Sequence, residues 1–247
     1  IALEETGTPA YCDLAIDISP DGKFYSSHVD RSSSPYRTDL VSDVSGETIL
    51  YNAFFGATYA QQDIAVDELG RIHMLGKSGP NISYKRFSGV DDSAAFHGSL
   101  GEGIGNNRLA LVLNGTDVHT AWTDDEGSLN VSFMDSSSLW ETEEVATTTA
   151  LEGQPMVGVA PDGSRWVAWY EPSEGTYYGN INIADDSAGT WTTHTLDTMA
   201  SDTEPRLEVD SEGRPHVMWH RQSVVDGVLE AKFLVHAVLV GDTWITT

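Results

Sequence analysis

The chain repeats one strand–turn–strand pattern five times, and this repeat limits the folds that it can adopt. Each copy is centred on a turn glycine: Gly22, Gly70, Gly115, Gly163 and Gly213. Around each glycine, apolar and smaller or polar residues alternate with period two, and no segment keeps a helical period. The glycines are 48, 45, 48 and 50 residues apart. A β-unit that recurs at this interval predicts the blade of a β-propeller.

Each unit carries two more strands after this pair, so that a blade has four antiparallel strands. Third strands are clearest at 81–87 and 128–134, and fourth strands begin at Trp140 and Trp191. We therefore expect an all-β fold, with residues 1–247 forming a single five-bladed propeller domain. The predicted blades cover roughly residues 10–58, 59–106, 107–153, 154–204, and 205–247 together with 1–9.

The two ends of the chain together make up one predicted strand. Residues 244–247 read as the start of a fourth strand, and residues 1–9 continue it in the way that residues 140–155 run on in the third unit. We predict that residues 1–5 pair beside residues 244–247 in one sheet. The N- and C-terminal strands would then close the ring and hide edges that an open sheet exposes.

The charge of the chain excludes two classes of partner. Thirty-eight acidic residues stand against 13 Lys and Arg, which gives a formal net charge of −25. Such a surface repels nucleic acid and anionic membranes, and no apolar run is long enough to span a bilayer. We expect neither nucleic-acid binding nor membrane insertion. Cys12 is the one cysteine, so an intramolecular disulfide is impossible.

The last blade carries the spacing D-x-x-G-x-x-H-x-x-W, from Asp210 through Gly213 and His216 to Trp219. Together with the fourth-strand tryptophans, this pattern resembles the BNR or sialidase-like repeats of bacterial propellers. Residues 185–191 resemble an Asp-box that is one residue too short between its glycine and tryptophan, and no sialidase-type arginine triad is present. The resemblance implies a secreted or periplasmic protein that binds or cleaves glycans. The opening residues lack a signal peptide, so we expect a mature form or an excised domain.

Residues that recur in every unit predict packing. Trp122, Trp169 and Trp219 share one register and are expected to fill the space between blades. His73, His119 and His216 share another register, in which the remaining units carry Tyr25 and Trp166. Three histidines raise the possibility of zinc, but they fall on different blades at a position that also accepts Tyr and Trp. We therefore predict buried histidines, with no metal site and no cofactor.

Residues that differ from unit to unit indicate the functional site. Seven positions before the turn glycines lie Ala15, Asp63, Arg108, Met156 and Arg206, which we expect to ring the mouth of the central channel. Two arginines near one axis repel each other unless an anion joins them. A ligand carboxylate, sulfate or sugar acid would do so. Alternatively, Asp63, Glu204 or Glu208 would neutralise them within the protein.

The ends of the second strands supply the rim of the same predicted site. His28 and Gly76 replace the tryptophan of the other units, and the rim adds His28, Lys77, Tyr170 and His220. Aromatic, cationic and acidic groups around a mouth suit a polar ligand such as a glycan. The predicted ligand-binding residues are therefore Arg108, Arg206, Asp63, His28, Lys77, Tyr170 and His220.

Three functions remain open at this stage. The first is an extracellular propeller that binds a glycan, or another small polar ligand, without catalysis. The second is a small carbohydrate-active enzyme: a glycoside hydrolase using two of Asp63, Glu204, Glu208 and Asp17, or a lyase using His28 or His220 with Tyr170 and Arg206. The third is a protein-interaction scaffold. The sequence leaves undecided whether the protein is an enzyme.

Overall fold

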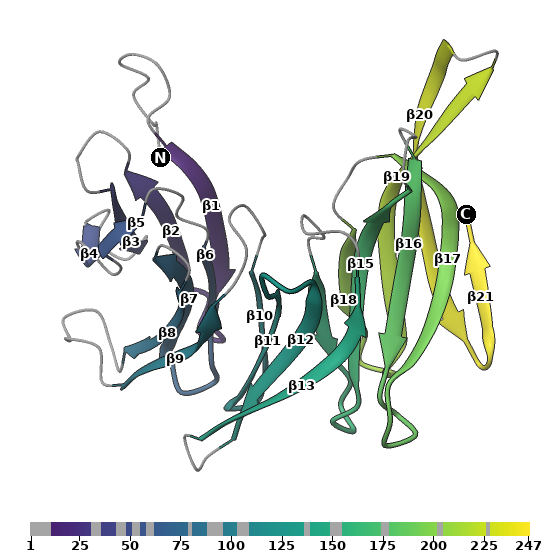
Figure 1. Ribbon diagram of the computed structural model, residues 1–247. Helices are drawn as coiled ribbons and strands as arrows, with labels where there is room; N and C mark the ends of the chain where they lie inside the picture. Colours follow the sequence, from purple (N-terminus) through teal and green to yellow (C-terminus); the bar gives the residue numbers. More distant parts are fainter. Residues whose placement is uncertain are drawn as a thin grey trace.

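The protein is a five-bladed β-propeller. The computed structural model describes residues 11–30, 36–42, 48–50, 55–57, 62–78, 81–87, 96–102, 109–135, 139–148, 155–173, 178–201, 205–225 and 228–247. Across these residues the regular secondary structure is β-strand, and five antiparallel units follow one another through the molecule (Figure 1). No helix in these ranges is long and apolar enough to cross a membrane. The all-β, five-bladed prediction is confirmed.

The strands follow the predicted units. Blade one holds β1 (Tyr11–Ile18), β2 (Phe24–Asp30), β3 (Tyr36–Ser42) and β4 (Thr48–Leu50), with β5 (Phe55–Ala57) also on β3. Blade two holds β6 (Gln62–Val66), β7 (Ile72–Ser78), β8 (Asn81–Phe87) and β9 (Phe96–Glu102). Blade three holds β10 (Ala110–Asn114), β11 (Asp117–Thr123), β12 (Ser128–Met134) and β13 (Trp140–Thr147).

The last two blades form one continuous sheet. Blade four holds β14 (Met156–Val159), β15 (Arg165–Pro172), β16 (Tyr178–Asp185) and β17 (Thr192–Ser201). Blade five holds β18 (Arg206–Val209), β19 (Pro215–Val225), β20 (Val228–Val240) and β21 (Thr243–Thr246). Ala200 of β17 pairs with Arg221 of β19 and joins the two blades. The predicted continuation of β21 by residues 1–9 lies outside the described residues, so closure by the two chain ends stays a prediction.

The tryptophans of the second strands fill the space between blades, as predicted. Trp122 packs with Leu75 and Tyr84 of blade two, and Trp219 packs with Ile181 and Ala200 of blade four. Trp169 packs in the same way in the cluster between blades three and four. These rings are 2% to 5% exposed. Burial of such large aromatic surfaces is the main force that stacks one blade on the next.

The first strand of each blade lies innermost, and β1, β6, β10, β14 and β18 contact one another in that order. An apolar residue near the start of an inner strand packs against the preceding blade. Ile64 of β6, Val157 of β14 and Leu207 of β18 are examples, and they are 2% to 4% exposed. Ile16 has the same register in blade one, yet it is 50% exposed. Among the described residues, the face of β1 that carries Ile16 is therefore more exposed to solvent than the corresponding faces of β6, β14 and β18.

Candidate functional site

The ladder register identifies the residues at the start of the inner strands. Asp63 pairs with Leu75, Met156 with Ala168, and Arg206 with Met218, so these residues occupy one level of the ring. In blade three Ala110 pairs with Ala121 at this level. The expectation that Arg108 belongs to the ring is wrong, because the β10–β11 turn has two residues where the other turns have five. Arg108 itself lies outside the described residues.

Asp63 is fixed at this level by two backbone amides. Its Oδ1 accepts the N–H of Ile64 at 2.9 Å, and its Oδ2 accepts the N–H of Leu111 in the next blade at 2.8 Å. Burial raises the pKa of Asp63 to about 7, opposed by these two hydrogen bonds. The negative charge of Asp17 adds to the rise, and the positive charge of Arg206 opposes it. Asp63 is therefore a carboxyl group that can change protonation near neutral pH.

Arg206 lies at the same level on blade five, and its side chain is exposed. Its Nη1 is 3.8 Å from Sδ of Met156, so the guanidinium turns toward blade four. Its charge acts on Asp63, which is consistent with both side chains lying at one end of the propeller. Glu208 is exposed two residues further along β18, whereas Glu204 lies outside the described residues. One carboxyl group and one guanidinium group thus lie at a level otherwise occupied by Ala15, Ala110 and Met156.

Three of the four predicted rim residues share a second level. Lys77, Tyr170 and His220 each follow the Gly76 or Trp position of their blade, whereas His28 lies at the tryptophan level itself. His220 is exposed, but Tyr170 is only 7% exposed and belongs to the packing between blades four and five. The side chains of His28 and Lys77 lie outside what the structure describes. The structure thus brings Asp63, Arg206 and His220 to one end, with Tyr170 contributing mainly to packing.

Two of the three histidines of the repeat, His73 and His216, are hydrogen-bonded within their own blades. His73 contacts Oδ2 of Asp67 at 3.1 Å and the Tyr84 hydroxyl at 2.7 Å. His216 likewise contacts Oδ2 of Asp210 at 3.1 Å, and its Nδ1 is 3.0 Å from Nε2 of His236. No group of three or more His, Cys, Asp or Glu in the described ranges could hold a metal ion. In blades two and five, the D-x-x-G-x-x-H spacing is therefore a hydrogen-bonded turn.

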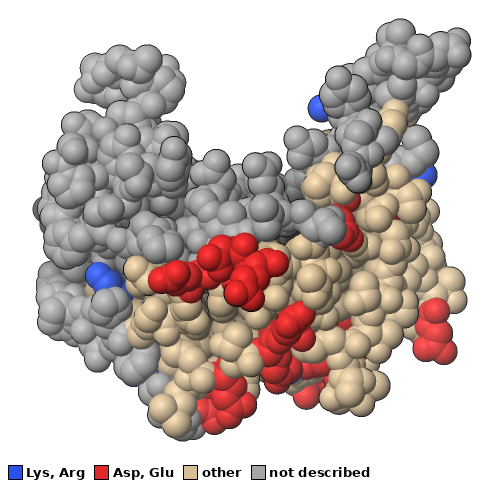
Figure 2. Space-filling view, in the orientation of Figure 1, with Lys and Arg blue, Asp and Glu red and all other residues tan. Residues whose placement is uncertain are grey.

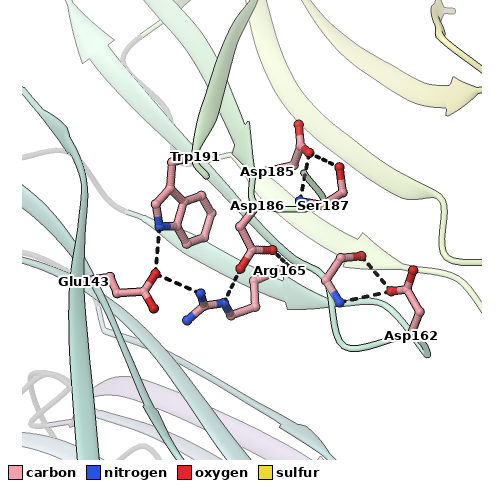
Figure 3. Close-up of polar contacts among 8 residues, drawn as sticks. Glu143, Asp162, Arg165, Asp185, Asp186, Ser187 and Trp191 are labelled. Atoms are coloured by element: carbon pink, nitrogen blue, oxygen red, sulfur yellow. Dashed lines mark hydrogen bonds and ion pairs between the residues drawn. The ribbon is translucent and has the colours of Figure 1, made fainter. Parts of the chain in front are cut away.

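The segment that resembles an Asp-box also has a structural role, shown in Figure 3. Both carboxylate oxygens of Asp186 bind Arg165, through its backbone N–H at 2.6 Å and its Nε at 2.5 Å. Arg165 and Trp191 then donate to the same oxygen of Glu143 on β13, at 2.8 and 3.1 Å. The Arg165 guanidinium lies 5.2 Å from the centre of the Trp191 ring. This network joins blades three and four at the end of the strands opposite Arg206.

A buried carboxylate near the rim, that of Asp197, could not be predicted from the sequence. Asp197 of β17 is almost fully buried and accepts the indole N–H of Trp219 at 2.7 Å. Its other oxygen lies 3.3 Å from Nη2 of Arg221, which is half exposed. Phe233 stands opposite Arg221 across the β19–β20 ladder and is 52% exposed. Asp197 is one of 38 acidic residues, so spacing alone could not single it out.

Acidic side chains outnumber basic ones on the described part of the face in Figure 2. Figure 2 shows Asp and Glu in several groups across the described part of one face, and Lys and Arg at only a few points. Glu141, Glu143 and Glu144 are all exposed along β13.

Solved structures with the same fold include proteins that act on or bind sugars and a hydrazine synthase of Kuenenia stuttgartiensis. An α-L-arabinanase of Penicillium chrysogenum in complex with arabinobiose matches 97% of this chain and 81% of its own at 14% identity, with a TM-score of 0.61. The GH93 α-L-arabinofuranosidase of Fusarium graminearum, also with arabinobiose, matches 96% and 80% at 12% identity and 0.64. A mutant of the Aleuria aurantia lectin, with α-methyl-L-fucoside, matches 95% and 76% at 13% identity and 0.64. At these identities the likeness establishes the fold. No family model and no curated protein matches the sequence.

Proposed function

We propose that the chain binds a glycan at the end of the ring where the inner strands begin. The observation that carries this proposal is the placement of Asp63 and Arg206 at one level, where the other described blades have Ala15, Ala110 and Met156. Arg206 is exposed at this level, whereas Asp63 also accepts a backbone hydrogen bond from the next blade.

The chemistry of the two groups suits a sugar. A guanidinium group donates several hydrogen bonds in one plane, which fits paired hydroxyl groups or the carboxylate of a sugar acid. A carboxyl group with a pKa near 7 can accept a hydrogen bond when ionised and donate one when protonated. An α-L-arabinanase, an α-L-arabinofuranosidase and a lectin that binds α-methyl-L-fucoside share this fold, which supports a saccharide as the ligand. We also propose that the protein works outside the cytoplasm, where glycan polymers are met.

Binding can be measured by titration calorimetry with a panel of neutral and acidic oligosaccharides. Arg206→Ala should weaken binding of the best ligand at least about tenfold, since it removes a charge-assisted contact. Arg214→Ala is a matched control, because Arg214 lies on the same blade at the opposite end of β18 and binds Asp210 there. Equal affinities for wild type and Arg206→Ala would place the site elsewhere. Absence of any binding glycan would overturn the proposal.

Glycoside hydrolysis is the second candidate, favoured by the raised pKa of Asp63. A glycosidase needs one protonated carboxyl group to donate to the leaving oxygen and a second carboxylate to activate water or attack the sugar. Asp63 fits the first role, and Asp17 or Glu208 is a candidate for the second. Water adds across the glycosidic bond, so neither an oxidant nor a cofactor is required.

Catalysis is tested by incubating the best-bound glycan with the protein and following new reducing ends. Asp63→Asn should retain binding and lose product formation, since an amide cannot donate the proton that the leaving oxygen needs. Bound glycan that stays intact over long incubation with wild type would leave a binding protein without catalysis.

A further inference from the structure

The β19–β20 hairpin is the longest in the described part of the molecule, and it carries exposed groups beyond the level of Arg206. Its strands have 11 and 13 residues, and it projects past the other blades in Figure 1. Near its base, Phe233 and Leu234 are 52% and 65% exposed. Successive residues of a strand point to opposite faces, so Phe233 lies on the face of Arg221 and Leu234 on the face of His220.

Phe233 and Arg221 are cross-strand partners, and a buried carboxylate lies beside the Arg221 guanidinium. Asp197 binds the Trp219 indole through one oxygen and faces Arg221 with the other, so a carboxylate buried between blades four and five orients the guanidinium. Phe233 is the cross-strand neighbour of Arg221 on the same face of the sheet. An exposed aromatic ring beside an oriented guanidinium is suited to the apolar face and the hydroxyl or acid groups of one sugar residue.

Arg206 and Arg221 leave opposite faces of the blade-five sheet, but both guanidinium groups reach residues of blade four. Arg206 turns toward Met156 of blade four, and Arg221 turns toward Asp197 of blade four. Arg221 lies three residues beyond Met218, the ladder partner of Arg206. The offset along β19 is thus roughly 10 Å, more than a single sugar ring spans.

We propose that Phe233 and Arg221 form a second sugar subsite, and that the ligand is an oligosaccharide chain running from the Asp63–Arg206 level to the β19–β20 hairpin. This inference rests on the proposed glycan binding. One sugar residue stacks on Phe233 and hydrogen-bonds to Arg221, while another lies at Arg206. A single-sugar ligand leaves the hairpin uncovered, whereas a chain of several units covers it.

The test compares ligands of increasing length by calorimetry. Starting from the glycan family that binds wild type best, affinity should rise from the monosaccharide to the trimer or tetramer. Phe233→Ala should remove most of that gain, about tenfold, and leave monosaccharide affinity unchanged. Arg221→Lys keeps the charge but loses the planar geometry, and should lower only the affinity for longer chains.

Leu139→Ala is the control, because Leu139 is 71% exposed just before β13 of blade three, far along the chain from the hairpin. It should match wild type for every length. If length does not raise affinity, or if Phe233→Ala binds all lengths like wild type, the second subsite is wrong while glycan binding at the mouth still stands. If no glycan binds and Phe233→Ala instead abolishes self-association in sedimentation, the hairpin is a contact between copies and both proposals fail.

Discussion

Asp63 joins blade two to blade three through one hydrogen bond, from the backbone N–H of Leu111 to its Oδ2, 2.8 Å long. Asp17 makes the corresponding link from blade one to blade two, accepting the N–H of Val66 at 2.6 Å. Each of these two inner strands is thus hydrogen-bonded to the inner strand of the next blade through an aspartate side chain, and not through backbone ladder hydrogen bonds. For Asp63, burial outweighs these bonds and keeps the pKa near 7.

Asp63 should therefore make stability depend on pH in an unusual direction for a carboxyl group. Its folded pKa lies above its unfolded value of about 4, so the folded state holds the proton more tightly. Stability from this group is present at low pH and is lost as pH rises through 7. Asp63→Asn should flatten that loss between pH 5 and 8 in urea unfolding, whatever its effect on absolute stability. Parallel pH profiles for the two proteins would contradict the assignment.

His119 should act in the opposite sense at lower pH. It is 6% exposed, burial lowers its pKa to about 4, and the positive charge of Arg165 adds to the effect. Folded His119 is neutral where the unfolded side chain takes up a proton, so its contribution is lost as pH falls from about 6.5 to 4. His119→Phe keeps a ring against Phe133, which stacks at 5.8 Å, and should lose less stability over that range than wild type. Thermal melts at pH 4 and 7 measure the difference.

The repeat predicted the fold because blade packing is local in sequence. Period-two alternation and regular turn glycines fix four strands per unit, and Trp122, Trp169 and Trp219 fill the expected spaces. The ring level was harder to predict, because counting back from a glycine assumes equal turns. Blade three has a tighter turn, so Ala110 replaces Arg108.

The polar side chains of the site are positioned by contacts between blades, and the spacing of residues along the sequence does not reveal these contacts. Asp63 was singled out as a break in the repeat, but its bond to Leu111 joins residues 48 positions apart. Asp197 and Arg221 meet only because blade four packs on blade five. Tyr170 looked like a rim residue, yet its ring is buried in that same interface. Long-range packing, rather than local pattern, decides these side chains.

Position 179 on β16 must be glycine because the ring of Tyr170, on the neighbouring strand β15, packs directly against it. A Cβ at position 179 would lie 2.6 Å from the Tyr170 ring and would also meet the carbonyl oxygen of Glu171. Gly179→Ala should therefore cost about 1–3 kcal/mol, because the ring or the backbone must move. Gly189→Ala meets nothing within 4 Å and suffers only from its φ of 80°, so it serves as the comparison. If only Gly189→Ala lost stability, the space between β15 and β16 at position 179 would be large enough for a methyl group, and the prediction would be wrong.

The charge of −25 predicts a stability that rises with salt. Exposed acids such as Glu141 and Glu144 on β13 repel one another most at low ionic strength. Between about 10 mM and about 1 M sodium chloride the Debye length falls from roughly 30 to 3 Å, which screens this repulsion. The melting temperature should rise across that range by several degrees, at about 2–4 °C for each kcal/mol of repulsion removed. Replacing Glu141 and Glu144 with Gln should raise the low-salt melting temperature and reduce the salt response. A flat response in wild type would mean that these acidic groups are too widely spaced or already paired, and the double variant would then melt like wild type at every salt concentration.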